Sequence, residues 1–130
     1  MPILVTWDNL QKRTVRMQFM YKWTVADYYT AIQKVVEMMK SVQHTVHILA
    51  DLSHTTTVPM DILVAASNAF NKFPENRGFV FVLHSNAFIR IMANTFLTVN
   101  PHLRQHIYFI NHRNEIFDTL DEVKATEVAS

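Results

Sequence analysis

The chain has 130 residues, enough for one domain that buries roughly two-thirds of the surface its unfolded chain exposes. Twelve Lys and Arg against eleven Asp and Glu give a formal net charge of +1, which argues against the clustered basic surface that nucleic acids or anionic membranes require. Because there is no cysteine and only one glycine, Gly78, the composition excludes disulfides, thiolate metal sites and glycine-rich phosphate loops.

The N-terminal segment predicts two strands that pair as a hairpin. Residues 3–7 are rich in β-branched and aromatic side chains, as strands usually are. In residues 14–19 apolar and polar side chains alternate, which is typical of a strand with one buried face. The short polar stretch between the two runs favours an antiparallel pair.

A helix is predicted next. Thr24 can cap its N-terminus, with Asp27 three residues later as in a capping box. Trp23 and Tyr28 occupy the positions of a hydrophobic staple. Apolar residues then recur at steps of three and four, so one side of this helix should pack on a sheet. The stripe consists of Tyr28, Ile32, Val35, Val36 and Met39.

Three apolar strands, at residues 46–50, 79–83 and 107–110, alternate with three further helices in the rest of the chain. Pro59 is expected to open the second helix and Pro74 to end it. The side chains expected to face inward are Leu63, Ala66, Phe70 and Phe73 in the second helix, Phe88, Met92, Phe96 and Val99 in the third, and Ile116, Leu120 and Val123 in the last.

This order, β-β-α-β-α-β-α-β-α, predicts a single-domain α/β fold with a mixed, mostly parallel five-stranded sheet and helices on both faces. The domain should span residues 1–124, and residues 125–130 should form a flexible tail. The first residues show no basic segment of the kind that begins a signal peptide, and no apolar run approaches the length of a membrane span. The expected location is therefore the cytoplasm.

Binding sites in open α/β sheets gather at the carboxyl ends of the parallel strands. Three polar segments are expected there as loops, at residues 51–57, 84–86 and 111–112. The candidate residues for binding a partner or a ligand are Asp51, Ser53, His54, Thr55, Val58, His84, Ser85, Asn86 and Asn111. The alternative is that these residues only cap helices and satisfy the loop backbone.

The segment 51–57 stands out because it holds four hydroxyl groups just before the second helix. Thr57 is nearest the expected N-terminus of that helix, where the helix dipole would stabilise an added phosphate. Thr57 and Thr56 are therefore the candidate phosphate acceptors.

Several short motifs lie at particular places in the predicted fold: Trp7-Asp8 near the start, Trp23-Thr24 before the first helix, Asp51-Leu52-Ser53 at the end of a strand, and Asn86-Ala87-Phe88 at the start of a helix. With these motifs the chain resembles the STAS domain family, and more closely its bacterial SpoIIAA-like subgroup. The resemblance covers most of the chain, roughly residues 3–123.

The resemblance implies a regulatory module in signalling, without catalytic activity of its own. Such a module binds a protein partner, often a kinase-like anti-sigma factor, and is switched by phosphorylation of a Ser or Thr at the start of the second helix. Residues 55–59 replace the family's usual Asp-Ser-Ser/Thr-Gly, so Thr56 or Thr57 would take the acceptor's place. We also expect a homodimer, and no cofactor.

A second interpretation is a carrier for a small apolar or anionic ligand. The SpoIIAA-like subgroup is similar in shape to lipid-transfer domains, and the chain is rich in Met and Phe, which line apolar pockets. The ligand would lie between the sheet and a helix or at the strand ends. Trp23, Tyr28 and Tyr29 are candidate lining residues, with core packing as the alternative.

A third interpretation is a hydrolase that uses His54 or His84 as a base. Asp51, Ser53 and Ser85 would supply the acid and the hydroxyl, although the chain lacks the Gly-x-Ser-x-Gly motif of a nucleophile elbow. The paired histidines at 44 and 47 and at 102 and 106 do not fit the spacing that a helix or strand needs for a metal. No metal site is expected.

Overall fold

The computed structural model describes residues 2–8, 12–84 and 86–116. The strands are β1 (Ile3–Trp7), β2 (Thr14–Tyr21), β3 (Val46–Thr55), β4 (Arg77–Leu83) and β5 (Ile107–Ile110). The helices are α1 (Val25–Lys40), α2 (Ile62–Phe70) and α3 (Ala87–Val99), followed by a short 3₁₀ turn, Pro101–Leu103. Ser85, Leu120, Val123 and the expected tail lie outside the described residues.

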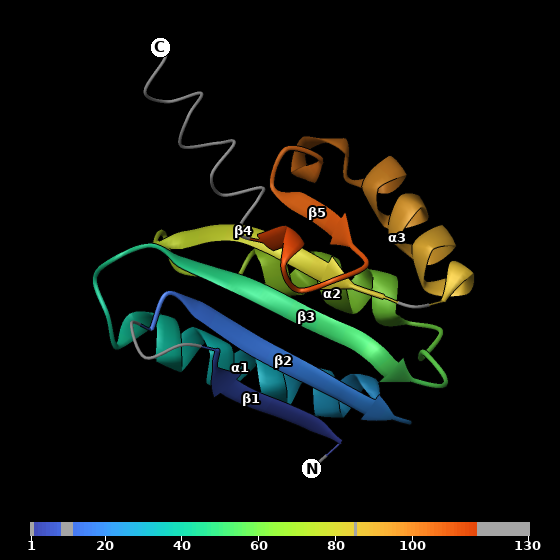
Figure 1. Ribbon diagram of the computed structural model, residues 1–130, viewed down its shortest axis with the longest axis horizontal. Coiled ribbons are helices and arrows are strands. Elements are labelled where there is room, and N and C mark those ends of the chain that lie inside the picture. The colour runs from blue at the N-terminus through green and yellow to red at the C-terminus, as the bar shows by residue number, and fades with distance from the viewer. Residues whose placement is uncertain (1, 9–11, 85, 117–130) are drawn as a thin grey trace.

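The five strands form one sheet in the order β1-β2-β3-β4-β5 (Figure 1). β1 is antiparallel to β2, and the pairs β2–β3, β3–β4 and β4–β5 are all parallel. The predicted fold class, a single-domain α/β fold with a mixed, mostly parallel five-stranded sheet, is confirmed. The prediction of helices on both faces is wrong for α1, α2 and α3, which all pack on one face, and most of the last predicted helix lies outside the described residues.

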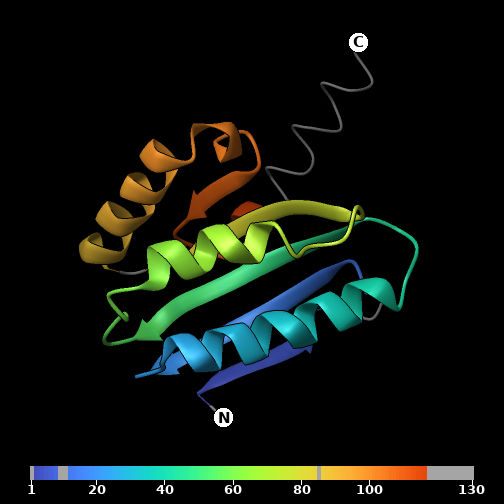
Figure 2. The ribbon, with the colours of Figure 1, turned by 180° about the vertical axis from the view of Figure 1, so that it is seen from behind.

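The helices that connect the parallel strands share one face of the sheet. Each new strand is added on the same side of the last one, so crossovers of the one usual hand place their helices together. Figure 2 shows α1 and α2 lying across that face, and α3 contributes Phe96 and Leu97 to the same core cluster. On the opposite face Ile116 packs against a separate cluster that includes Leu49 and Phe81.

The start of α1 matches its prediction in detail. The backbone N–H of Asp27 donates to the Thr24 hydroxyl, and the backbone N–H of Thr24 donates to the Asp27 carboxylate, so the capping box is present. The rings of Trp23 and Tyr28 lie with their centroids 6.2 Å apart. The inward stripe of α1 is buried as expected, including Ile32, Val35 and Met39.

The prediction that residues 51–57 form a loop is wrong for its first five residues, because β3 continues to Thr55. Partners far away in sequence keep this polar stretch extended. Asp51 pairs with Arg16 of β2, and Thr55 accepts a hydrogen bond from Trp23. The second helix also begins later than predicted, at Ile62 instead of Pro59.

The predicted inward face of the third helix is correct for Met92 and Phe96 and wrong for Phe88 and Val99. Phe88 is 55% exposed and Val99 is also exposed, whereas Ile89, at 5%, and Phe96 are buried. Every position of α3 from Phe88 to Met92 except Arg90 is apolar. The sequence pattern alone therefore does not select the buried side.

Within the described ranges, no helix has the length and apolar character needed to cross a membrane.

Candidate functional site

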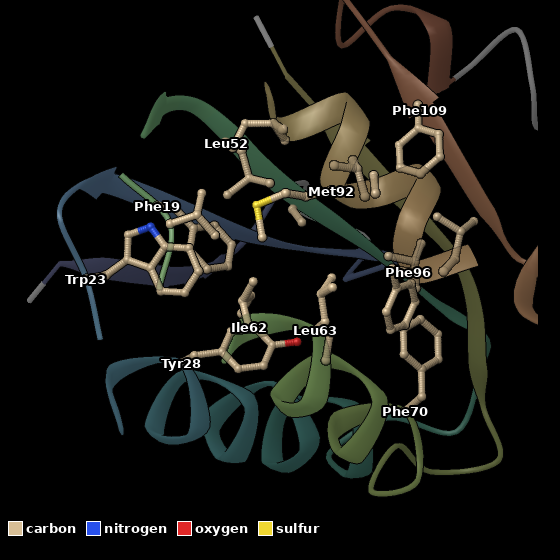
Figure 3. A pocket seen from close by; sticks show the side chains of 18 residues that line it. Phe19, Trp23, Tyr28, Leu52, Ile62, Leu63, Phe70, Met92, Phe96 and Phe109 are labelled. Carbon is tan, nitrogen blue, oxygen red and sulfur yellow. The ribbon is translucent and has the colours of Figure 1, made fainter. Parts of the chain in front are cut away.

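A cavity of about 150 Å³ lies between the sheet, α2 and α3 (Figure 3). Its floor comes from β3, β4 and β5, and its sides come from the inward residues of the two helices. Ile62 and Leu63 of α2 point across it toward Met92 of α3. The cavity is partly open to solvent, so a small molecule can reach it.

Small side chains contribute to the space of the cavity. Ala50 of β3, Ala66 of α2 and Ala93 of α3 all line it. The core of a folded protein is normally packed to crystal density, and an alanine leaves volume that a longer side chain would fill. The residues come from three separate elements, so the fold alone brings them together.

Aromatic rings form the end of the pocket nearest α1. The Phe19 and Trp23 rings lie 4.8 Å apart, and the Tyr28 ring lies 6.2 Å from Phe19. The Trp23 indole N–H donates to the Thr55 hydroxyl at 3.3 Å, and that hydroxyl donates to the Phe19 carbonyl at 3.4 Å. The polar atoms of Trp23 and Thr55 are thus paired within the protein.

The Tyr28 hydroxyl differs, because no described residue forms a hydrogen bond with it. Tyr28 is 9% exposed and lines the pocket, with its hydroxyl beside Ile62 and Leu63 of α2 (Figure 3). Burial, and to a smaller extent the neighbouring Tyr29, raise the pKa of Tyr28 far above its usual range. The hydroxyl therefore keeps its proton at any ordinary pH and is available as a donor.

The sequence-predicted residues divide between the two faces of the sheet. Neighbouring residues of a strand point to opposite sides, and Asp51 and Ser53 lie on the face away from the pocket, where Asp51 bonds Arg16. Val58 lines the pocket. His54 is exposed, and Ser85 is outside the described residues.

The ends of β3, β4 and β5 share one edge of the sheet, as predicted, because these strands are parallel. Asn86 caps α3 by accepting from the backbone N–H of Phe88. The backbone N–H of Asn111 donates to the carboxylate of Glu115. His84 lies against the Phe109 ring, and burial, then the nearby Arg90, lowers its pKa despite Glu115.

Thr56 and Thr57 do not lie at the N-terminus of α2. Their backbone N–H groups both donate to the carbonyl of Tyr21 at the end of β2, and α2 begins five residues beyond Thr57, at Ile62. Asp61 already places a carboxylate at the start of that helix. The helix dipole that was expected to favour a phosphate on Thr57 is thus not beside it.

On the opposite face, Asp51 is the centre of a small polar cluster. Its carboxylate accepts from Arg16 Nη2 at 2.6 Å and from the Ser53 hydroxyl at 2.5 Å. Burial alone would raise the pKa of Asp51, but the hydrogen bonds from Ser53 and Arg16 and the charge of Arg16 hold it below its ordinary value. The ion pair of Arg16 and Asp51 thus links β2 to β3.

The geometry of the described residues supports neither a hydrolase site nor a metal site. Within the described ranges no serine hydroxyl bonds a histidine, and Ser53 donates to Asp51 instead. His44 Nε2 lies 2.7 Å from the Lys12 carbonyl, while His47 Nδ1 accepts from the Phe79 backbone N–H. In the same part of the chain, no three His, Asp or Glu side chains come together as metal ligands.

Of the candidate lining residues that the sequence suggested, with core packing as the alternative, Trp23 and Tyr28 line the pocket and Tyr29 does not. Met92, Phe70 and Phe96, which were expected to face inward, line it as well. The cavity itself could not be predicted, because nothing in the sequence around an alanine shows that the residue borders a cavity. Comparison of the chain with models of known protein families, with curated proteins and with solved structures gives no match.

Proposed function

We propose that this protein binds a small apolar molecule in the pocket between the sheet, α2 and α3. The observation that supports this function is a cavity of about 150 Å³ whose walls are apolar side chains. Enclosed apolar cavities of about this volume take up molecules of about the size of benzene, and this pocket, although partly open, has a similar volume. Such a protein acts by holding its ligand, as a carrier or a sensor, with no chemical step of its own.

The pocket has the character expected of a ligand site. Small-molecule sites are concave, mainly apolar and carry a few polar groups that orient the ligand. Here the aromatic wall of Phe19, Trp23 and Tyr28 is held by ring contacts, and the flexible Met92 side chain also lines the pocket. A ligand gains the free energy of transferring its apolar surface from water.

The test is binding of toluene, followed through the methyl signals of ¹³C-labelled methionine in NMR spectra. The Met92 signal should shift with a dissociation constant between about 1 µM and 1 mM. Met60, which is 95% exposed, provides the internal control and should not shift. No shift of Met92 at the solubility limit of toluene would overturn the proposal.

A variant that fills the pocket provides the second arm. Ala93→Leu places a larger side chain in the cavity and should weaken toluene binding by at least about tenfold, or about 1.4 kcal/mol. Ala87→Leu makes the same change at the exposed first residue of α3, outside the pocket, and should bind like the unmodified protein. Equal affinities for all three proteins would place the toluene elsewhere.

A second candidate function, a regulatory module that binds protein, is supported by the family resemblance and by exposed apolar residues on α2 and α3. Val64 of α2, Phe88 and Ile91 of α3, and Met60, two residues before α2, are all exposed, and the two helices start at the same edge of the sheet. The partner to test is a second copy of the chain. Light scattering after gel filtration should then give a dimer that Val64→Glu dissociates, and a monomer at high concentration contradicts self-association.

A further inference from the structure

We propose that the ligand of this pocket carries one uncharged hydrogen-bond acceptor, such as the carbonyl oxygen of a ketone or an ester, and that the Tyr28 hydroxyl binds it. This inference rests on the proposed function and adds the chemical class of the ligand. It makes Tyr28 the residue that selects among apolar molecules of equal shape.

The first argument is that the Tyr28 hydroxyl is a donor that the fold itself does not use. Its side chain is nine-tenths buried, and no described residue bonds its hydroxyl. Among the described residues, the fully buried side-chain atoms without a partner are Arg16 Nε and Arg77 Nη1, so the Tyr28 hydroxyl is not sealed in the packed core and faces space that a ligand can reach. The neighbouring Tyr29 shows the usual arrangement, because its hydroxyl accepts from Asn68 Nδ2 at 3.1 Å.

The second argument is position. Tyr28 lines the pocket, and Figure 3 shows its hydroxyl on the side of Ile62 and Leu63, the first two pocket residues of α2. Phenylalanine would serve equally well as the apolar half of the staple with Trp23 and as a partner for the Phe19 ring. The packing around Tyr28 therefore does not need the hydroxyl oxygen, which can instead interact with a ligand in the pocket.

The third argument concerns charge. None of the side chains that line the pocket carries a formal charge. Arg77 stacks on the Phe70 ring, with its guanidinium carbon 5.1 Å from the ring centroid, but is not one of the lining residues. A carboxylate in this pocket would lose its hydration without gaining a cation, so the bound acceptor is neutral.

The experiment uses two ligands of the same shape, acetophenone and α-methylstyrene, in which a carbonyl oxygen replaces a methylene group. The unmodified protein should prefer acetophenone, and Tyr28→Phe should lower that preference about five- to tenfold. Tyr29→Phe is the matched control, since Tyr29 already has Asn68 as its partner, and should keep the preference. Benzoate should bind at least about tenfold more weakly than acetophenone.

The outcomes separate the two proposals. If both ligands bind and Tyr28→Phe changes their affinities by the same factor, the role of Tyr28 is overturned while the pocket remains a binding site. If the unmodified protein binds neither ligand, the proposed function is overturned and the inference with it. Should Tyr28→Phe fold poorly, the infrared carbonyl band of bound acetophenone decides: a hydrogen bond to Tyr28 lowers its frequency relative to apolar solvent, and an unshifted band contradicts the proposal.

Discussion

Replacement of Asp51 by alanine should lower the free energy of unfolding by about 3 kcal/mol. Asp51 is 1% exposed and its carboxylate accepts from Arg16 Nη2 at 2.6 Å. Arg16 is itself largely buried, and its Nε has no partner within the described residues. Without the carboxylate, the guanidinium would remain in the protein without a counter-charge, which is the expensive outcome for a buried pair.

The double variant Arg16→Met with Asp51→Leu separates this explanation from a general loss of packing. Two apolar side chains of similar volume can replace a buried ion pair at little cost, so the double variant should recover most of the stability. Urea unfolding of both variants measures this. A double variant as unstable as Asp51→Ala would show that the charge left on Arg16 is not the cause.

The same pair gives stability a dependence on pH. The pKa of Asp51 is lower in the folded protein than its ordinary value, through Ser53 and Arg16 and despite burial. Its contribution is therefore complete above the unfolded-state pKa near 4 and is lost as the pH falls through the folded-state pKa. Asp51→Asn, which cannot ionise, should remove this part of the acid sensitivity.

The fold class was predictable because its signals are local. The capping box of Thr24 and Asp27 and the apolar stripe of α1 each lie within a few turns of one helix. The strands β1 and β5 likewise begin and end where their apolar runs do. Alternation of such elements then restricts the fold to a parallel sheet covered by helices.

The end of β3 was not predictable in this way. The apolar run that predicts the strand ends at residue 50. Asp51, Ser53 and Thr55 favour turns, so nothing in residues 51–55 themselves indicates that the strand continues. Their partners are Arg16 and Trp23, which are 35 and 32 residues away in sequence. A polar strand is stable here because tertiary contacts outweigh local propensity.

The pocket was unpredictable for a similar reason, because it too depends on contacts between distant parts of the chain. Met92 and Phe96 read as core residues, and they do pack inward. The volume beside them depends in part on Ala50, Ala66 and Ala93, which line the pocket from three different elements. That placement requires the strand order and the rotation of α3. The sequence left the rotation of α3 open because both of its sides carry apolar residues.

Gly78→Ala should lower the free energy of unfolding by about 2–3 kcal/mol. A Cβ atom on Gly78 would overlap the His47 imidazole, 2.6 Å from Cε1, and lie 2.9 Å from Thr45 Cγ2. The register between β3 and β4 shifts at this point: Val46 pairs with Arg77 and Ile48 with Val80. His47 therefore faces both Gly78 and its neighbour Phe79.

His47 cannot move aside without loss. Its Nδ1 accepts from the backbone N–H of Phe79 at 2.9 Å, and its ring stacks on the Phe79 ring with centroids 5.7 Å apart. Burial and then the charge of Arg13 lower the pKa of His47, which keeps the ring neutral and Nδ1 able to accept. The only glycine of the chain thus provides space for a ring, which is a common reason for glycine within a strand.

A double-mutant cycle tests this explanation of Gly78. In a His47→Ala background the imidazole is gone and the 2.9 Å contact with Thr45 Cγ2 remains, so adding Gly78→Ala should cost at least about 1 kcal/mol less than in the unmodified protein. The reduced freedom of the unfolded chain offsets part of the cost that remains. Chemical denaturation of the four proteins gives the coupling energy between the two sites. If Gly78→Ala costs the same in both backgrounds, the methyl group is not in conflict with His47, and the glycine must serve the backbone instead.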